Sequence, residues 1–151
     1  MNQFNLVKQL AINALFWVGI VAIVLSLLAG SLYFLVFFAG LILFNFVIVN
    51  LLSNSIKFTA QGFVKLDIKF DLNNTILIVV EDSGIGINSK NLGIIFEPFK
   101  QINSDYPNKG MGLGLTIVKY VVKLLNGNIE VKSSEGKGTS FFVFIPVKRV
   151  S

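Results

Sequence analysis

Between Gln9 and Ile56 the chain has no charged side chain, a run of 48 residues. Within this run, residues 10–30 and 32–49 are apolar almost throughout. Each segment has about the 20 residues that a helix needs to cross the hydrocarbon layer of a membrane. The small residues Gly30 and Ser31 separate them. The sequence therefore predicts two membrane-crossing helices, about 10–30 and 32–49, joined as a tight hairpin.

The charges that flank this segment predict its orientation. Lys8 precedes the first apolar run and Lys57 follows the second. Because basic residues are retained on the cytoplasmic side of a membrane, a hairpin places both of them there. We therefore expect a cytoplasmic start at residues 1–9, a segment in the inner (cytoplasmic) membrane, and a cytoplasmic domain at 50–151.

Each apolar run has a second interpretation. For the first run, Lys8 followed by an apolar core and by small residues at 29–31 is also the pattern of a secretory signal peptide. For the second run, five residues follow the spacing of a helix that packs one face on a protein core: Phe44, Val47, Ile48, Leu51 and Leu52. The other face of that helix is apolar too, which favours lipid, and we expect the helix to continue into the soluble domain.

The composition of the remaining chain is that of a soluble domain, with 12 basic and 8 acidic residues from Lys57 onward. The chain has no Cys, which excludes disulfides and thiol chemistry. It also has no His, which removes the commonest general base and metal ligand.

A strand that ends in an acid and two glycines is the first candidate for a binding site. Residues 75–80 form an apolar, β-branched run, and Asp82, Gly84 and Gly86 follow it. Glycines permit positive φ and a close approach of backbone to a ligand. A carboxylate at Asp82 can accept a hydrogen bond from a purine amino group. An ordinary strand exit with a surface Asp is the alternative.

A polar helix face is the second candidate. Asn50, Asn54 and Lys57 are spaced i, i+4 and i+7, so they share one side of the predicted helix. An Asn carbonyl oxygen suits a hard cation such as Mg²⁺, and a Lys suits phosphate. A solvated helix face is the alternative interpretation.

Glycines before a helix form the third candidate. Residues 110–115 read Gly-Met-Gly-Leu-Gly-Leu and precede a predicted helix at 116–125, whose first N–H groups can face an anion. The polar residues 100–109 before them form either a surface linker or a mobile cover.

Three further strands and one short helix are predicted from the rest of the sequence. Alternation predicts a strand at 63–70 that forms a hairpin with the 75–80 strand. Two more strands are predicted at 129–133 and at 140–147, where residues 141–145 are strongly β-forming. Asn88 is placed to cap a short helix that reaches Ile95.

Together, these blocks resemble the ATP-binding catalytic domain of sensor histidine kinases. The resemblance covers about residues 44–148 and rests on five blocks in order: Asn54 with Lys57-Phe58-Thr59, Asp82-x-Gly84-x-Gly86, Phe96-Glu97-Pro98-Phe99, Gly110-x-Gly112-Leu113-Gly114-Leu115 and Gly136-x-Gly138-Thr139. That domain has the Bergerat fold, an α/β two-layer sandwich also found in DNA gyrase and mismatch-repair ATPases.

The resemblance implies that the domain binds ATP and Mg²⁺. Asn54 would bind the metal, Lys57 would lie near the phosphates, and Phe58 would lie against the base or sugar. Asp82 would accept from the adenine amino group with Thr139 behind it. Residues 100–109 would be the lid over the nucleotide. The implied nucleotide-binding residues are Asn50, Asn54, Lys57, Phe58, Asp82, Gly84, Gly86, Gly110, Gly112, Leu113, Gly114 and Thr139.

Departures from the family pattern limit the implied activity. Asn50 stands where the related ATPases have the Glu that activates water, which fits the kinase branch instead. Met111 replaces the usual Thr or Ser, and Leu43 and Phe46 replace polar residues. No dimerisation segment with a phosphoacceptor His is present, so the chain cannot phosphorylate itself on His.

These departures define the expected function and its alternatives. We expect a membrane-anchored kinase-like domain that donates the γ-phosphoryl group of ATP to a His on a partner, such as a full-length kinase, and through it to a response regulator. The alternatives are an ATP-binding regulatory module without turnover and a serine kinase of the anti-sigma-factor type. No nucleic-acid partner is expected.

Overall fold

The computed structural model describes residues 13, 16–25, 27, 32–71, 74–101 and 111–147. The chain divides into two compact units, residues 1–49 and 50–151. Each unit is described by itself.

The first unit is helical wherever it is described. A short apolar helix covers Phe16–Leu25, and helix α2 begins at Leu32. Residues 10–12, 14–15, 26 and 28–31 lie outside the described residues, so the predicted hairpin stays a prediction.

Helix α2 spans Leu32–Phe58 without interruption, which confirms that the second apolar run continues beyond Val49. Among the described residues, one stretch, Phe34–Phe58, is long and apolar enough to cross a membrane. Only 11% of its most apolar window is buried, whereas the core helix of a soluble protein is mostly buried. A signal sequence near an N-terminus passes the same test of length and composition.

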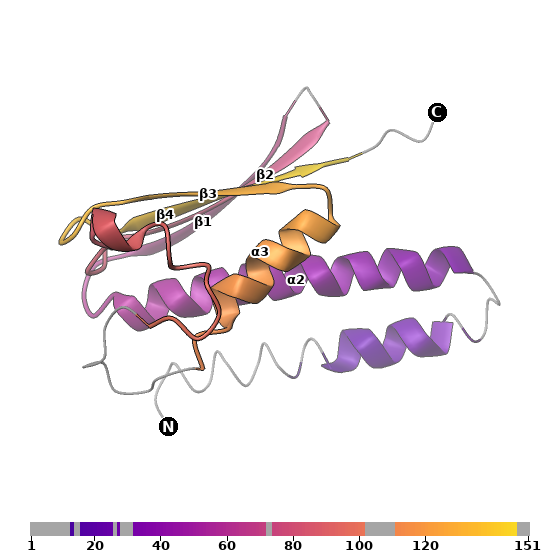
Figure 1. The fold of residues 1–151 in the computed structure, drawn as a ribbon. Helices are drawn as coiled ribbons and strands as arrows, with labels where there is room; N and C mark the ends of the chain where they lie inside the picture. Colours follow the sequence, from indigo (N-terminus) through magenta and orange to yellow (C-terminus); the bar gives the residue numbers. More distant parts are fainter. Residues whose placement is uncertain are drawn as a thin grey trace. The chain divides into compact units, whose positions relative to one another are not determined.

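The second unit contains one antiparallel sheet. Its strands are β1 (Val64–Asp71), β2 (Thr75–Asp82), β3 (Asn128–Ser133) and β4 (Thr139–Pro146), in the order β1-β2-β4-β3. Helix α3 (Gly114–Leu124) packs against β3 and β4 on one face of the sheet (Figure 1). The four predicted strands and this helix are therefore confirmed with shifts of one or two residues at most of their ends.

The core lies on the face of the sheet that α3 covers. Alternate residues of β2 and β4 are buried there, and α3 adds a buried valine cluster: Ile78, Val80, Phe141, Val143, Ile145, Val118, Val121 and Val122. Because side chains alternate along a strand, the next residues on the same face are Asp82 at the end of β2 and Thr139 at the start of β4. These two polar residues are 5% and 6% exposed, so they lie at the edge of the apolar core.

The segment after Asn88 differs from the prediction. The Asn88 side chain does accept a hydrogen bond from Lys90 N, as a cap should. However, the helix is a single 3-10 turn, Ser89–Asn91, and turns replace its expected continuation to Ile95. Gly93 disfavours helix in this segment, and Pro98 prevents its extension.

Ser55 provides a test of the packing of α2. Its side chain is 2% exposed, and its hydroxyl has no hydrogen-bond partner among the described residues. A buried hydroxyl without a partner costs free energy, so Ser55→Ala should raise the free energy of unfolding by about 1 kcal/mol. Chemical denaturation of both proteins measures this difference.

The matched control is Ser53→Ala, which is half-buried on the same helix and gains the same helix propensity. The gain in Ser55→Ala should exceed the gain in Ser53→Ala. A Ser55→Ala protein less stable than the parent would show that the hydroxyl is satisfied.

Candidate functional site

Asp82 is held by two backbone N–H groups from different parts of the chain. Its Oδ1 atom accepts from Gly84 N at 3.0 Å and from Thr139 N at 3.2 Å. Both bonds end on the same oxygen, and Oδ2 makes no hydrogen bond with any described residue. The carboxylate is therefore fixed in orientation, with Oδ2 available to accept a hydrogen bond from a ligand.

The loop after Asp82 is clamped on two sides. On one side, Ile85 N donates to Phe58 O at the end of α2, at 3.1 Å. On the other side, Gly136 N donates to Ile85 O at 2.7 Å, and Ile87 N donates to Ser133 Oγ at 2.8 Å. The backbone that follows the carboxylate therefore has little freedom to move.

Two glycines are required here by the protein's own backbone. A Cβ at Gly84 would collide with the carbonyl oxygen of Phe58. Gly86 has a φ of +67°, and a Cβ there would collide with the carbonyl oxygen of Ser134. The predicted positive φ is confirmed at Gly86, while Gly84 allows a close approach to α2. Contact of either glycine with a ligand stays a prediction.

The first residue of the predicted polar face of α2, Asn50, lies beside the start of α3. Asn50, Asn54 and Lys57 are all half-buried. A Cβ at Gly114 would lie 3.1 Å from Asn50 Oδ1, which places Asn50 against the first residue of α3. The Asn54 side chain makes no hydrogen bond with the residues that the structure describes, so its amide is available to a ligand.

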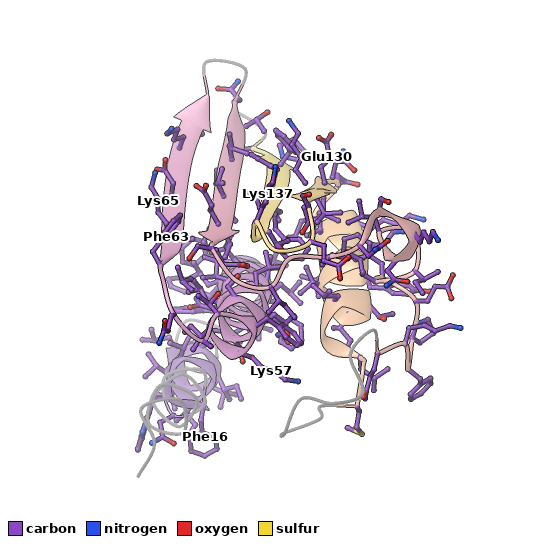
Figure 2. All side chains as sticks on the ribbon, turned by 90° about the vertical axis from the view of Figure 1, so that its left-hand side faces the viewer. Phe16, Lys57, Phe63, Lys65, Glu130 and Lys137 are labelled. Atoms are coloured by element: carbon purple, nitrogen blue, oxygen red, sulfur yellow. The ribbon has the colours of Figure 1, made fainter. Side chains whose placement is uncertain are left out.

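Lys57 occupies the C-terminal end of α2. Its Nζ lies 4.9 Å from the centre of the Phe58 ring, a cation–π contact. Figure 2 shows its side chain leaving the end of this helix. Lys57 forms no ion pair with a described residue, so its charge is available to an anion.

The start of α3 leaves backbone donors open. Leu113 is its N-cap residue, and no side-chain hydrogen bond caps the helix. The first N–H groups of a helix have no partner within it. Gly112, with a φ of +71°, accepts from Phe99 N at 3.1 Å, which joins the two ends of the predicted lid. Gly110 and lid residues 102–109 lie outside the described residues.

The donor set fits a metal held mainly by a ligand. Among the described residues, no three His, Cys, Asp or Glu side chains gather into a metal-binding group. Mg²⁺ commonly takes only one or two protein ligands and completes its shell with phosphates and water. The single amide oxygen of Asn54 therefore fits Mg²⁺ that arrives with a nucleotide rather than a resident ion.

Ser133 is a residue of the site that sequence reasoning missed. Its hydroxyl contacts Ile87 N, Gly138 O and Thr139 Oγ1 at 2.7 to 2.9 Å. It therefore joins the loop after Asp82 to the residue behind that carboxylate. Its position, last in a strand and just before a Gly-x-Gly turn, is the signal that could have found it.

Comparisons with known proteins agree with this geometry. The family model for histidine kinase-, DNA gyrase B- and HSP90-like ATPases matches residues 42–149. Among curated proteins, the autoinducer 2 sensor kinase/phosphatase LuxQ of Vibrio parahaemolyticus is 43% identical over 111 residues, which are 69% of this chain and 13% of LuxQ. A sensor-like histidine kinase of Rhizobium meliloti is 40% identical over 106 residues, 68% of this chain and 20% of its own length.

Solved structures of histidine kinases show the same fold. The mycobacterial sensor histidine kinase MprB superposes with a TM-score of 0.62 at 28% identity, covering 72% of this chain and 73% of that one. Full-length ShkA in complex with AMPPNP superposes with a TM-score of 0.60 at 28% identity, covering 69% of this chain and 21% of that one.

The chain spans 5% to 20% of the length of the curated relatives it matches. The family match, however, extends over more than half of the chain. The matched residues include the whole sheet, helix α3 and the sequence blocks around Asp82. The chain therefore belongs to the family of histidine kinase-, DNA gyrase B- and HSP90-like ATPases, with sensor histidine kinases as its relatives.

Proposed function

We propose that this chain binds Mg-ATP and donates the γ-phosphoryl group to a His on a partner protein in two-component signal transduction. The observation that carries the proposal is the Asp82 carboxylate, oriented by two backbone N–H groups with Oδ2 left to accept. That arrangement suits the amino group of adenine. The ShkA structure contains AMPPNP, an ATP analogue, and this supports ATP as the ligand of the chain described here, which is similar to ShkA.

The remaining residues of the site are suited to the phosphates. Lys57 supplies a positive charge, and the uncapped first turn of α3 supplies backbone N–H donors with a favourable helix dipole. Asn54 offers an amide oxygen to the metal. When bound, Mg²⁺ neutralises charge on the phosphate oxygens. Phosphoryl transfer depends mainly on such positioning and charge stabilisation, so the chain needs no catalytic base of its own.

The acceptor has to lie outside these 151 residues, because they contain no His. The partner surface we propose surrounds the start and exposed face of α3. Large apolar side chains are exposed there, at 41% to 76%: Phe99, Met111, Ile117, Tyr120 and Leu124. An apolar patch of this kind beside a phosphate site suits a protein partner.

A module that binds ATP without turnover is the second candidate function. It is favoured by Met111, which has no hydroxyl for a phosphate at a position where the family usually has one. A serine kinase is the third. ATP hydrolysis is disfavoured, because Asn50 has no carboxylate that could act as a base to activate water. Asn50 also lies against Gly114.

We propose that residues 10–49 anchor the chain in the cytoplasmic membrane, with the ATP site in the cytoplasm. The apolar, largely unburied stretch Phe34–Phe58 supports this proposal.

Asp82→Asn tests the nucleotide site. Because Oδ1 must still accept two N–H groups, the amide nitrogen of the new Asn occupies the position of Oδ2 and faces the adenine amino group donor to donor. ATP affinity should fall about 10- to 100-fold, the value of a charge-assisted hydrogen bond. Calorimetric titration of the full chain in detergent, with and without Mg²⁺, measures it.

The matched control is Glu81→Gln, which removes the neighbouring acid on the opposite face of β2 and should leave ATP affinity unchanged. Equal affinities in Asp82→Asn and the unmutated chain would refute the base-binding role of Asp82.

Radiolabelled ATP distinguishes the three candidate functions. Incubation of the chain with a full-length histidine kinase whose own ATP site has been inactivated should transfer label to a His on that partner, and Asn54→Ala should abolish the transfer. Acid-labile label identifies phosphohistidine. Acid-stable label would identify the serine kinase, and binding without transfer would identify the silent module. Steady hydrolysis that disappears in Asn54→Ala would contradict the role assigned to Asn50.

Cell fractionation tests the membrane anchor. The full-length chain should stay in the membrane pellet after alkaline carbonate extraction, because a spanning helix resists extraction whereas a peripheral protein does not. Recovery in the carbonate supernatant would contradict the anchor. A chain shortened by about 30 residues in its measured mass would instead support a cleaved signal peptide.

A further inference from the structure

Three polar side chains form a row across neighbouring strands at one end of the sheet. Asp82 of β2 is the register partner of Thr139 of β4, and Thr139 is the register partner of Ser133 of β3. Alternation places Asp82 and Thr139 on the buried face, and Ser133 reaches Thr139 directly, with 2.9 Å between the two hydroxyl oxygens. The row therefore runs from the Asp82 carboxylate, which we propose binds the base, to the Thr139 hydroxyl and then to the Ser133 hydroxyl.

The hydrogen bonds of Ser133 determine which hydroxyl donates to which. A Ser hydroxyl has one proton and two acceptor positions. Ile87 N–H can only donate, and it donates to Ser133 Oγ at 2.8 Å. The Gly138 carbonyl can only accept, and it takes the Ser133 proton at 2.7 Å. The second acceptor position of Ser133 is then filled by the Thr139 hydroxyl, which must be the donor.

The Thr139 hydroxyl has therefore directed its only proton away from Asp82. For any other partner, the Thr139 Oγ1 atom offers only lone pairs, and the Asp82 Oδ2 atom likewise offers only lone pairs. Neither side chain therefore has a proton to donate to a base, and both can accept one. Acceptors of this kind match an amino group, which donates, and repel an oxo group, which only accepts.

We infer that Ser133 is a positioning residue that makes this site select a purine with an amino group over one with an oxo group. The inference rests on the proposed binding of ATP and adds to it the origin of base selectivity. Without Ser133, the Thr139 hydroxyl is free to rotate and donate, and an oxo purine gains a partner. A hydroxyl with no contact to the base would then control which base binds.

Paired titrations of the full chain with Mg-ATP and Mg-inosine triphosphate test this inference. Inosine triphosphate has an oxo group where ATP has the amino group. The unmutated chain should prefer ATP. In Ser133→Ala, the ratio of the two affinities should fall about five- to tenfold, the value of about one hydrogen bond. The ratio is the decisive measurement, because a purely structural defect weakens both nucleotides equally.

Two variants provide controls. Ser134→Ala removes an exposed neighbouring hydroxyl and should keep the ratio of the unmutated chain. Ser133→Thr retains the hydroxyl and should restore the ratio that Ser133→Ala loses. Equal weakening of both nucleotides in Ser133→Ala, or no rescue by Ser133→Thr, would overturn the inference.

Thr139→Val covers the case in which Ser133→Ala does not fold. It keeps Ser133 and the shape of the strand residue but removes the oriented hydroxyl, so the ratio should fall here too. An unchanged ratio in Thr139→Val overturns the inference. If the unmutated chain binds neither nucleotide, the proposed function is wrong and the inference falls with it, whereas binding with an unchanged ratio in the variants overturns the inference alone.

Discussion

The site depends on the two backbone N–H groups that converge on Oδ1 of Asp82. One comes from Gly84, two residues along the chain, and the other from Thr139, 57 residues away. This convergence requires backbone to approach backbone closely, which is why a Cβ at Gly84 would collide with Phe58 O and a Cβ at Gly138 with Asp82 O. The glycines of the motif are therefore explained by contacts within the protein, and the carboxylate is oriented before any ligand arrives.

Helix α2 combines two requirements in one element. Its N-terminal part is apolar and mostly unburied, and its C-terminal part presents Asn50, Asn54 and Lys57. The helix continues between them without a break, and the family match begins at residue 42, within the apolar run. Residues 42–49 are therefore shared by the family match and the apolar run. Under our proposal that this run lies in lipid, apolar residues are expected at 43 and 46, where the family is usually polar.

The sequence predicted those features of the fold that depend on local periodicity. Alternation located the strand at 63–70, runs of β-forming residues located the strands at 75–80 and 140–147, and the Gly-rich segment located the start of α3. Asp82 and Thr139 were paired only through the family resemblance, because no periodicity reveals a contact across 57 residues. Ser133 was missed because its role lies in three contacts made through folding, not in its residue type. The short helix after Asn88 was predicted too long, because its cap was recognised but the effect of Gly93 was not.

The most direct test of this account is a crystal structure of the full chain with Mg²⁺ and AMPPNP, in which the distance from the adenine amino nitrogen to Asp82 is measured. We predict about 3 Å to Oδ2, with the N–H groups of Gly84 and Thr139 still on Oδ1. A base bound elsewhere, or a carboxylate that has released either N–H group to reach the base, would contradict the claim that the protein orients Asp82 in advance.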